Sequence, residues 1–353
     1  MKINFIIPFT NLTGGIKVVF EYCNRLKDLG HEINIYVPMK AYKFNNSGFI
    51  GILKTLKASV GNTFIRGTKV NWFNLNCKIK LVPYIRDRYI EDADICIATA
   101  WPTAYDVNNL SISKGKKVYF IQHYEAWSGE KDEVDNSYKL DLEHIVIAKW
   151  LQELMLDKFK KESTIIYNGI DKSEFLYNDK RVMDNITICI LYHKLEWKGF
   201  LDGIKAIDKV KKRYPNIRVL AFGTERGEDI PDYVEFYEKP SRQKIKEIYS
   251  DSDIYVFPSK KEGWGLTVIE AMACKCAVVG TNTGALLEVG VDGENCLISH
   301  PEDINALNNN IIKLIEDASM RNYIAKNGYN LALEFEYENS VEKMEQFFRK
   351  LLG

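Results

Sequence analysis

Short apolar runs alternate with amphipathic stretches along most of the chain. Residues 3–9 and 32–38 are largely apolar, as buried strands are, and between them Val18, Tyr22 and Leu26 recur at helical spacing. Further strands are predicted at 94–99, 117–122, 144–148, 164–168, 186–192, 217–223, 253–258 and 276–281, and helices at 199–213, 241–250 and from residue 266. Strands that alternate with helices in this way are typical of parallel, doubly wound sheets.

The alternation is interrupted once, by a polar stretch around 177–184, and then restarts. With 353 residues the chain has the length of two domains of ordinary size. We therefore predict an α/β protein with two facing Rossmann-like domains, residues 1–170 and 171–335. Apolar residues at helical spacing predict a last helix over 338–352, and we expect the segment 336–353 to pack back toward the first domain.

The overall composition excludes several classes of protein. Lys and Arg total 48, equal to Asp and Glu, and this balance argues against a nucleic-acid-binding chain. No apolar run approaches the roughly 18 residues of a membrane span, and the first residues do not form a signal peptide. The seven cysteines are odd in number and scattered, which fits reduced thiols better than disulfides or a zinc site. These features predict a cytoplasmic protein.

The charge is uneven locally. Residues 33–86 contain nine Lys and Arg but no Asp or Glu. Within this segment a helical stripe is formed by Phe49, Leu53, Leu56, Val60 and Phe64. A basic amphipathic helix suits an anionic membrane surface or an anionic acceptor. The alternative is a helix that packs its stripe on its own sheet and keeps its lysines in solvent.

The strongest chemical pattern lies at 258–285. Gly263 and Gly265 precede a helix that must begin near Leu266, and helix starts with nearby glycines favour phosphate groups. Glu262 and Glu270 stand eight residues apart on either side of that start, and carboxylates accept hydrogen bonds from sugar hydroxyls. Each also has a structural alternative: a capping box of Ser259 with Glu262, and a salt bridge for Glu270.

This segment resembles the E-x7-E signature of the family-4 retaining glycosyltransferases, which have the GT-B fold of two Rossmann-like domains and an inter-domain cleft. Other segments resemble motifs of the family in the same order: the glycine loop Gly14–Gly15 and the stretches 30–37, 165–175, 195–207 and 279–298. The resemblance covers essentially the whole chain. It implies an acceptor-side first domain and a second domain that binds a nucleotide-sugar.

The resemblance also implies roles for individual residues. Glu262 would hold hydroxyls of the donor sugar, Glu270 the ribose, and Lys198 the charge of the leaving diphosphate. Backbone groups of the donor loop, Gly263, Gly265, Leu266 and Thr267, would meet the distal phosphate. The family commonly places an Arg before that Lys as a second contact to the diphosphate. Here the matching position holds His193, with Lys194 next, and either residue would take this donor-binding role.

In the first domain His123 ends a predicted strand where the family often has a histidine near the donor sugar. The resemblance thus implies three catalytic residues, His123, Lys198 and Glu262. Tyr124, Glu125 and Trp127 are candidates for the acceptor side, and Tyr237 and Lys239 for a loop near the nucleotide base.

A metal is not expected. The DSD sequence at 251–253 has the form of a metal motif, but DAD at 92–94 also precedes a predicted strand, so both fit a helix-to-strand turn better. No other cluster has metal-ligand spacing. We therefore expect no metal and no cofactor, the nucleotide-sugar being a substrate.

Together these features predict a retaining hexosyl- or deoxyhexosyltransferase that moves a sugar to a hydroxyl of a glycan or lipid-linked acceptor. Cell-surface polysaccharide synthesis, peripheral to the inner face of the membrane, is the expected setting. No carboxylate is obviously placed as a nucleophile, which favours front-face attack over double displacement. The alternatives are a nucleotide-sugar epimerase of the same fold and a catalytically silent binding subunit; a dehydrogenase is disfavoured because no G-x-G-x-x-G follows a strand.

Overall fold

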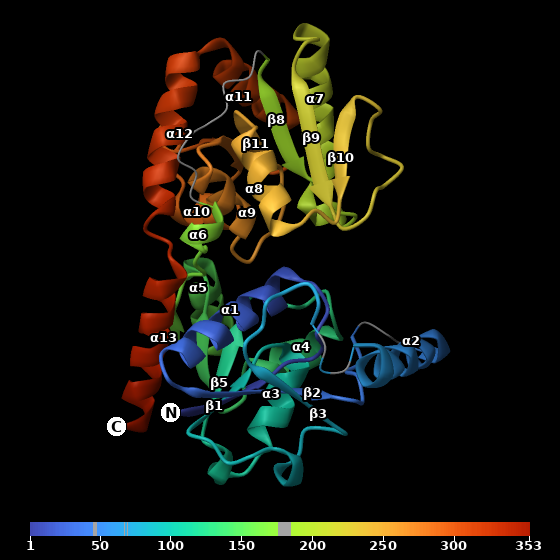
Figure 1. Ribbon diagram of the computed structural model, residues 1–353, viewed down its shortest axis with the longest axis vertical. Coiled ribbons are helices and arrows are strands. Elements are labelled where there is room, and N and C mark those ends of the chain that lie inside the picture. Colours follow the sequence, from blue (N-terminus) through green and yellow to red (C-terminus); the bar gives the residue numbers. More distant parts are fainter. Residues whose placement is uncertain (45–47, 67, 69, 176–184) are drawn as a thin grey trace. The chain divides into compact units, whose positions relative to one another are not determined.

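The chain forms two compact units (Figure 1). The computed structural model describes residues 1–44, 48–66, 68, 70–175 and 185–353, so the predicted polar break at 177–184 lies outside the described residues. The N-terminal unit comprises Met1–Tyr167 together with Tyr337–Gly353, and the C-terminal unit comprises Asn168–Glu336. The chain thus changes unit at 167/168 and 336/337, beside the predicted boundaries at 170/171 and 335/336.

The described residues of the N-terminal unit build a parallel sheet in the order β3-β2-β1-β4-β5-β6-β7. Its strands are β1 (Lys2–Ile6), β2 (Glu32–Pro38), β3 (Lys78–Val82), β4 (Ile95–Ala98), β5 (Lys116–Ile121), β6 (Glu143–Val146) and β7 (Ser163–Ile165). Its helices are α1 (Gly14–Asp28), α2 (Gly48–Val60), α3 (Trp101–Asn108), α4 (Lys131–Ser137), α5 (Lys149–Phe159) and α13 (Tyr337–Leu352). A π-helical turn, Gly61–Arg66, continues α2.

The described residues of the C-terminal unit build a second parallel sheet in the order β10-β9-β8-β11-β12-β13. Its strands are β8 (Thr187–Leu191), β9 (Arg218–Gly223), β10 (Val234–Glu238), β11 (Ile254–Phe257), β12 (Ala277–Thr281) and β13 (Leu297–Ser299). Its helices are α6 (Lys172–Phe175), α7 (Phe200–Arg213), α8 (Arg242–Ser250), α9 (Leu266–Ala273), α10 (Ala285–Val289), α11 (Ile304–Glu316) and α12 (Ala318–Ala332). Two doubly wound parallel sheets confirm the predicted fold class.

The strands that the sequence pattern missed are β3, β10 and β13. Each lies at the edge of its sheet. An edge strand is covered less completely than a central one, so it keeps more polar positions and lacks a continuous apolar run. In β3 and β10 lysines and glutamates interrupt the apolar residues, as in KIKLV and VEFYE.

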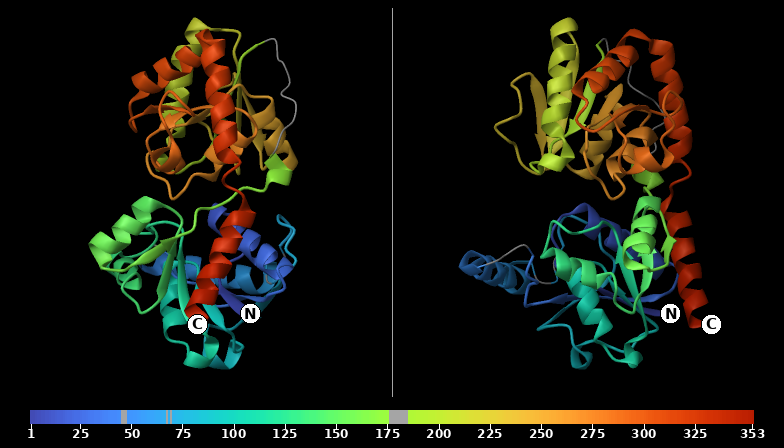
Figure 2. Two further views of the ribbon diagram at one scale, coloured as in Figure 1. Left: turned by 90° about the vertical axis from the view of Figure 1, so that its left-hand side faces the viewer. Right: turned by 180° about the vertical axis from the view of Figure 1, so that it is seen from behind.

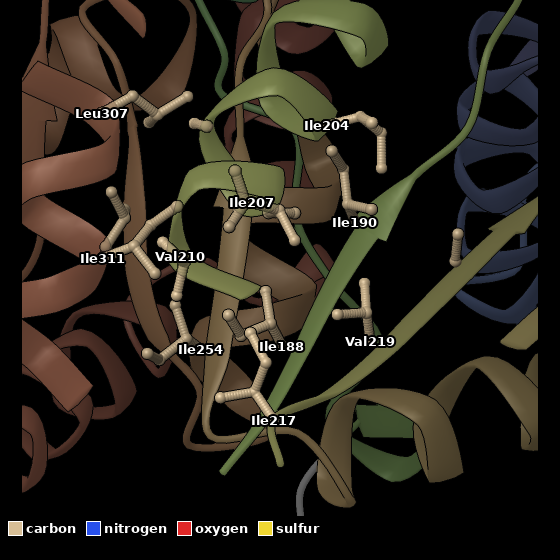
Figure 3. Close-up of a cluster of buried hydrophobic side chains, with 14 of the residues drawn as sticks. Ile188, Ile190, Ile204, Ile207, Val210, Ile217, Val219, Ile254, Leu307 and Ile311 are labelled. Atoms are coloured by element: carbon tan, nitrogen blue, oxygen red, sulfur yellow. The ribbon is translucent and has the colours of Figure 1, made fainter. Parts of the chain in front are cut away.

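The core of the C-terminal unit is built where helices α7 and α11 meet the middle of the sheet (Figure 3). Ile204, Ile207 and Val210 of α7 lie with Ile188 of β8 and Ile311 of α11, and all five are buried. Burying side chains of this size contributes about 1.5–3 kcal/mol each. This packing fixes β8 next to β11, and because the two strands are parallel, the loops that follow them emerge at one edge of the sheet.

The last helix, α13, packs on α1 within the N-terminal unit (Figure 2). The rings of Tyr22 and Tyr337 meet edge to face with centroids 5.9 Å apart, and the guanidinium of Arg25 lies 4.6 Å from the Tyr337 ring centroid. Met344 and Phe348 are fully buried. The apolar stripe of this helix therefore completes the core of the N-terminal unit.

Candidate active site

Lys198 and Glu262 come together at the carboxyl edge of the second sheet. Lys198 ends a 3-10 turn after β8, and Glu262 lies in the loop after β11, the neighbouring strand. The Lys198 Nζ is 2.7 Å from Glu262 Oε1, and the Ser259 hydroxyl donates to the same oxygen at 3.0 Å. Both bonds involve Oε1 only. Two predicted site residues that are 64 positions apart therefore form one ion pair.

The loop between Glu262 and α9 depends on two glycines. Gly265 is the N-cap of α9 with φ of +89°, and a Cβ at this position would lie 3.0 Å from the Phe257 ring. Gly284 has φ of +54°, and a Cβ there would lie 2.5 Å from the Trp264 carbonyl oxygen and 2.8 Å from Glu262 Cβ. These backbones can approach only because neither residue has a side chain.

The start of α9 has the form that phosphate groups prefer. The helix begins at Leu266, as predicted, and Gly265 has no side chain with which to cap the first amides. The amides of Leu266 and Thr267 thus lie in the first turn, at the positive end of the helix dipole. The capping-box interpretation of Ser259 and Glu262 is wrong, because no helix begins at Ser259 and the two side chains bond to each other instead.

Glu270 lies one turn farther along α9 and is only 5% exposed. Both terminal nitrogens of Arg242 donate to its Oε1 at 3.3 Å, and Arg242 also holds Glu174 at 2.7 and 3.0 Å. Burial opposes the charge of the guanidinium, but the two carboxylates outweigh it, so the pKa of Arg242 is raised above its usual value. The salt-bridge alternative for Glu270 is present, with a partner that the sequence analysis missed.

A signal for Arg242 does exist in the sequence. A carboxylate inside an apolar helix such as α9 requires a cation close by. Arg242 follows Ser241, whose hydroxyl caps α8 by accepting from the Lys244 amide at 3.2 Å. Sequence spacing could locate the helix start, but only the packing of α8 and α6 beside α9 selects this cation.

The two candidates for the family's Arg position differ in environment. The His193 Nδ1 accepts a hydrogen bond from the Leu195 amide at 3.0 Å, which leaves Nε2 as the nitrogen that carries the proton. Burial, and next the charge of Lys198, lower the pKa of His193. Lys194 instead pairs with Glu225 at 2.9 Å, and both of these side chains are exposed. A neutral imidazole donor and a solvent-facing lysine are therefore the two groups available.

In the N-terminal unit, Gly14 and Gly15 are the first two residues of α1 and not a loop, because the helix is capped by Thr13, whose hydroxyl accepts from the Ile16 amide. The Gln122 side chain donates to the Gly15 carbonyl at 3.1 Å. This bond joins the start of α1 to the end of β5.

His123 follows β5 as predicted. Its Nδ1 lies 3.1 Å from the Tyr124 carbonyl, which can only accept, so Nδ1 is the donor in this hydrogen bond. The ring also meets Trp127 at 4.3 Å and Trp150 at 5.7 Å between centroids. The neighbouring Glu125 carboxylate accepts from the Trp101 amide at 2.7 Å, and burial raises the pKa of Glu125 to about 7.

The DSD sequence at 251–253 and the DAD sequence at 92–94 have a structural role. The Asp253 carboxylate accepts from the Thr187 amide at 2.9 Å, and Asp94 accepts from the Lys2 amide at 2.7 Å in the other unit. Both residues link neighbouring strands. DSD lies between the end of α8 and the start of β11, as predicted, whereas DAD follows a 3-10 turn, Asp87–Tyr89, and not an α-helix. Within the described residues, no three His, Cys, Asp or Glu side chains gather as metal ligands would.

The residues predicted near the base are arranged differently from expectation. Tyr237 belongs to β10 and not to a loop, and the Lys244 Nζ lies 4.8 Å from its ring centroid. Lys239 follows the strand with φ of +45° and pairs with Glu238 at 3.2 Å.

A family model matches the unit that carries Lys198, Glu262 and Glu270. Residues 177–331 match the model of the glycosyl transferases group 1. The C-terminal unit thus resembles the group 1 glycosyl transferases, and the chain as a whole has the GT-B fold. Assignment of the chain to family 4, and with it the E-x7-E signature, stays a prediction.

Curated glycosyltransferases are similar to parts of this chain. The capsular polysaccharide biosynthesis glycosyltransferase CapM of Staphylococcus aureus is 27% identical over 59% of the chain and 61% of the relative. An uncharacterized glycosyltransferase of Methanocaldococcus jannaschii, MJ1178, is 25% identical over 59% of each chain. The match thus spans about six tenths of the length of these relatives.

Among solved structures, Anabaena HepE, crystallised with UDP and glucose, superposes with a TM-score of 0.76. That similarity covers 99% of each chain at 16% identity. At this identity it shows that the two proteins share a fold.

Proposed function

We propose that this protein is a retaining glycosyltransferase that moves a sugar from a nucleotide-sugar donor to a hydroxyl group. The observation that carries the proposal is the Lys198–Glu262 ion pair just before α9, together with Glu270, which is buried in α9 and paired with Arg242 of α8. A cation, free helix amides and two carboxylates within one unit match a diphosphate flanked by two sets of hydroxyl groups.

The proposed chemistry assigns one task to each group. Lys198 and the amides of Leu266 and Thr267 offset the negative charge that develops on the leaving diphosphate as the glycosidic bond breaks. Glu262 accepts from hydroxyls of the sugar, and Glu270 accepts from the ribose. His193, neutral and protonated at Nε2, supplies a further donor to the diphosphate, and His123 acts on the donor sugar.

We further propose front-face attack. The acceptor oxygen bonds to the anomeric carbon on the side from which the diphosphate leaves, and a diphosphate oxygen takes the acceptor proton. Retention then needs no carboxylate nucleophile. In this proposal Lys198 and the amides at the start of α9 offset the charge of the diphosphate, and the reaction needs no metal ion.

The expected substrates follow from the relatives. HepE was crystallised with UDP and glucose, so UDP-hexoses are the first donors to test, with GDP-linked hexoses and deoxyhexoses next. CapM acts in capsular polysaccharide biosynthesis, which supports a glycan or lipid-linked acceptor and a role in cell-surface polysaccharide synthesis. We place this activity in the cytoplasm, peripheral to the inner face of the membrane.

Thermal shifts with UDP, GDP, ADP, dTDP and CMP and their sugar conjugates test the donor. A ligand at a hundred times its dissociation constant adds about 2.7 kcal/mol of stability. We expect one nucleotide to give a clear shift that is lost in Lys198→Met and Glu270→Gln but kept in Lys209→Met, whose lysine is exposed on α7. No shift from any nucleotide would overturn the proposal.

Product analysis then separates the reaction from its alternatives. The preferred donor and a panel of glycan and lipid-linked acceptors should yield a glycoside with the anomeric configuration of the donor, read by NMR. An epimerised donor formed without acceptor would identify an epimerase instead. Donor binding without turnover on any acceptor would identify a binding subunit.

Chelation tests metal independence. We expect the rate of sugar transfer to be unchanged in EDTA after dialysis against it. A loss of turnover that Mg²⁺ or Mn²⁺ restores would show that a metal ion shares the work assigned to Lys198 and the start of α9.

A further inference from the structure

Helix α2 presents its large apolar side chains to solvent. Leu53, Leu56 and Val60 are 51%, 58% and 51% exposed. At 100° per residue these positions fall on one face of the helix, and the exposed Lys57 lies beside them. The side chains of Phe49 and Phe64, predicted for the same stripe, lie outside the described ones. The alternative that the stripe packs on its own sheet is therefore wrong for Leu53, Leu56 and Val60.

Polar contacts tie α2 and the turn that follows it to the rest of the N-terminal unit. The Ser59 hydroxyl accepts from the Ala41 amide at 3.0 Å and donates to the Thr55 carbonyl at 2.8 Å. In the π-helical turn that follows, Asn62 is buried and donates to the Pro38 carbonyl at the end of β2 at 3.2 Å. A surface helix ordinarily buries its apolar side and exposes its polar one. In α2 the described large apolar side chains are instead exposed, and the hydrogen bonds to Ala41 and Pro38 hold this part of the chain in place.

The sequence segment that contains α2 is basic. Lys40, Lys43, Lys57 and Lys78 are exposed, and the whole segment 33–86 contains no carboxylate side chain. Lys80 is left out of this set because it pairs with Glu91. Figures 1 and 2 show α2 standing away from the sheet of its own unit. The exposed apolar stripe thus belongs to a projecting helix in a segment whose charged residues are all Lys or Arg.

We propose that the stripe of Leu53, Leu56 and Val60 docks on an anionic lipid bilayer, with the surrounding lysines at the lipid phosphates. An interfacial helix binds in this way, by shallow burial of its apolar face and by attraction between basic residues and anionic headgroups. A second copy of the chain is a poorer occupant, because two basic surfaces would face each other. Within the described residues no helix is long and apolar enough to cross a bilayer, so the contact is peripheral.

Sedimentation with vesicles tests this surface. The full chain should bind vesicles of phosphatidylglycerol and phosphatidylcholine at low salt, bind pure phosphatidylcholine far less, and dissociate as salt screens the charges. The triple variant Leu53→Ser, Leu56→Ser, Val60→Ser should lose roughly tenfold or more in vesicle affinity. Ile112→Ser is the matched control, since Ile112 is 92% exposed in the same unit but lies outside the segment, and it should bind as the wild type does.

Two outcomes would overturn the proposal: no binding of the wild type to anionic vesicles, or equal binding by the triple variant and the Ile112 control. If the wild type instead self-associates in sedimentation velocity and the triple variant does not, the stripe serves a second copy. The idea that the acceptor is linked to a lipid rests on the proposed function. Binding to vesicles is measured without a nucleotide-sugar donor, so it does not depend on transfer of a sugar. The donor-induced thermal shift should be unchanged in the triple variant, so failure of the transferase and failure of the membrane contact are read separately.

Discussion

The contact between Arg242 and Glu270 is the part of the site whose loss should be seen first in stability. Arg242→Met removes the cation from a carboxylate that is almost fully buried, and breaking such a pair destabilises a protein because the remaining charge loses its partner. Since the Arg242 side chain is partly exposed, we expect a loss of about 1–3 kcal/mol in urea unfolding, together with weaker donor binding.

Lys244→Met is the control for Arg242→Met, because Lys244 pairs with Glu247 at 3.2 Å on the same helix and both side chains are exposed. It should change stability by about 0.5 kcal/mol or less. The double variant Arg242→Met, Glu270→Gln removes both charges and should be more stable than Arg242→Met alone. Equal stability of Arg242→Met and Lys244→Met in urea unfolding would contradict this account of the Arg242–Glu270 pair.

His144 should make the N-terminal unit sensitive to acid. The side chain is 2% exposed on β6, and neither ring nitrogen has a hydrogen-bond partner among the described residues. Burial, and next the charge of Lys161, lower the pKa of His144 to about 4 from 6.5. The unfolded chain therefore takes up a proton below pH 6.5 that the folded chain does not, and stability falls as the pH drops from 6.5 toward 4.

The size of this effect is about 3 kcal/mol at the acid end of that range. His144→Phe keeps a ring beside Tyr119 but removes the titration, so its stability should fall less between pH 6.5 and pH 4. The exposed His300→Phe serves as control and should follow the wild type. Parallel curves for wild type and His144→Phe in urea unfolding at both pH values would refute the assignment.

At the scale of elements, the donor loop depends on the close approach of two backbones. Gly284→Ala would place a Cβ against both the Trp264 carbonyl and Glu262, so the loop that carries Glu262 must shift. Gly293 also has a positive φ, +77°, but a Cβ there meets nothing within 4 Å. The two substitutions share the backbone strain of about 1 kcal/mol, and only the first adds a steric clash.

We therefore expect Gly284→Ala to reduce donor affinity and turnover by roughly tenfold or more, and Gly293→Ala to leave both near the wild-type values. The donor-induced thermal shift measures the first and product formation the second. Equal effects of the two alanines would mean that strain, and not the position of Glu262, governs the site.

At the scale of the whole molecule, the last helix, α13, stabilises the N-terminal unit, although it follows the C-terminal unit in the sequence. Phe348 of α13 is fully buried in the N-terminal unit, and Phe348→Ala should cost about 3–5 kcal/mol. Hydrogen exchange should show the loss of protection in residues 1–167 and 337–353, and little change in 168–336. Phe347→Ala, next in the chain but less buried, should have a smaller effect. Loosening confined to the C-terminal unit would contradict the division into units.

The sequence by itself determined the fold class, the central strands, the start of α9 at Leu266 and the pattern around Glu262 and Glu270. These features depend on local physical chemistry: apolar runs form buried parallel strands, and glycines before an apolar helix mark a helix start that is free of side-chain caps. Edge strands such as β10 were not predicted, because their polar residues interrupt the apolar pattern.

Tertiary structure alone decided which residues meet. Lys198 meets Glu262 because β8 and β11 are neighbours in a parallel sheet, and Arg242 meets Glu270 because α8 packs beside α9. The orientation of α2 was also beyond the sequence, since an apolar stripe has the same spacing whether it faces a core or solvent. Hydrogen bonds such as the one from the Ala41 amide to Ser59 turn that stripe outward. Periodicity shows which side chains share a face, and only packing decides what that face contacts.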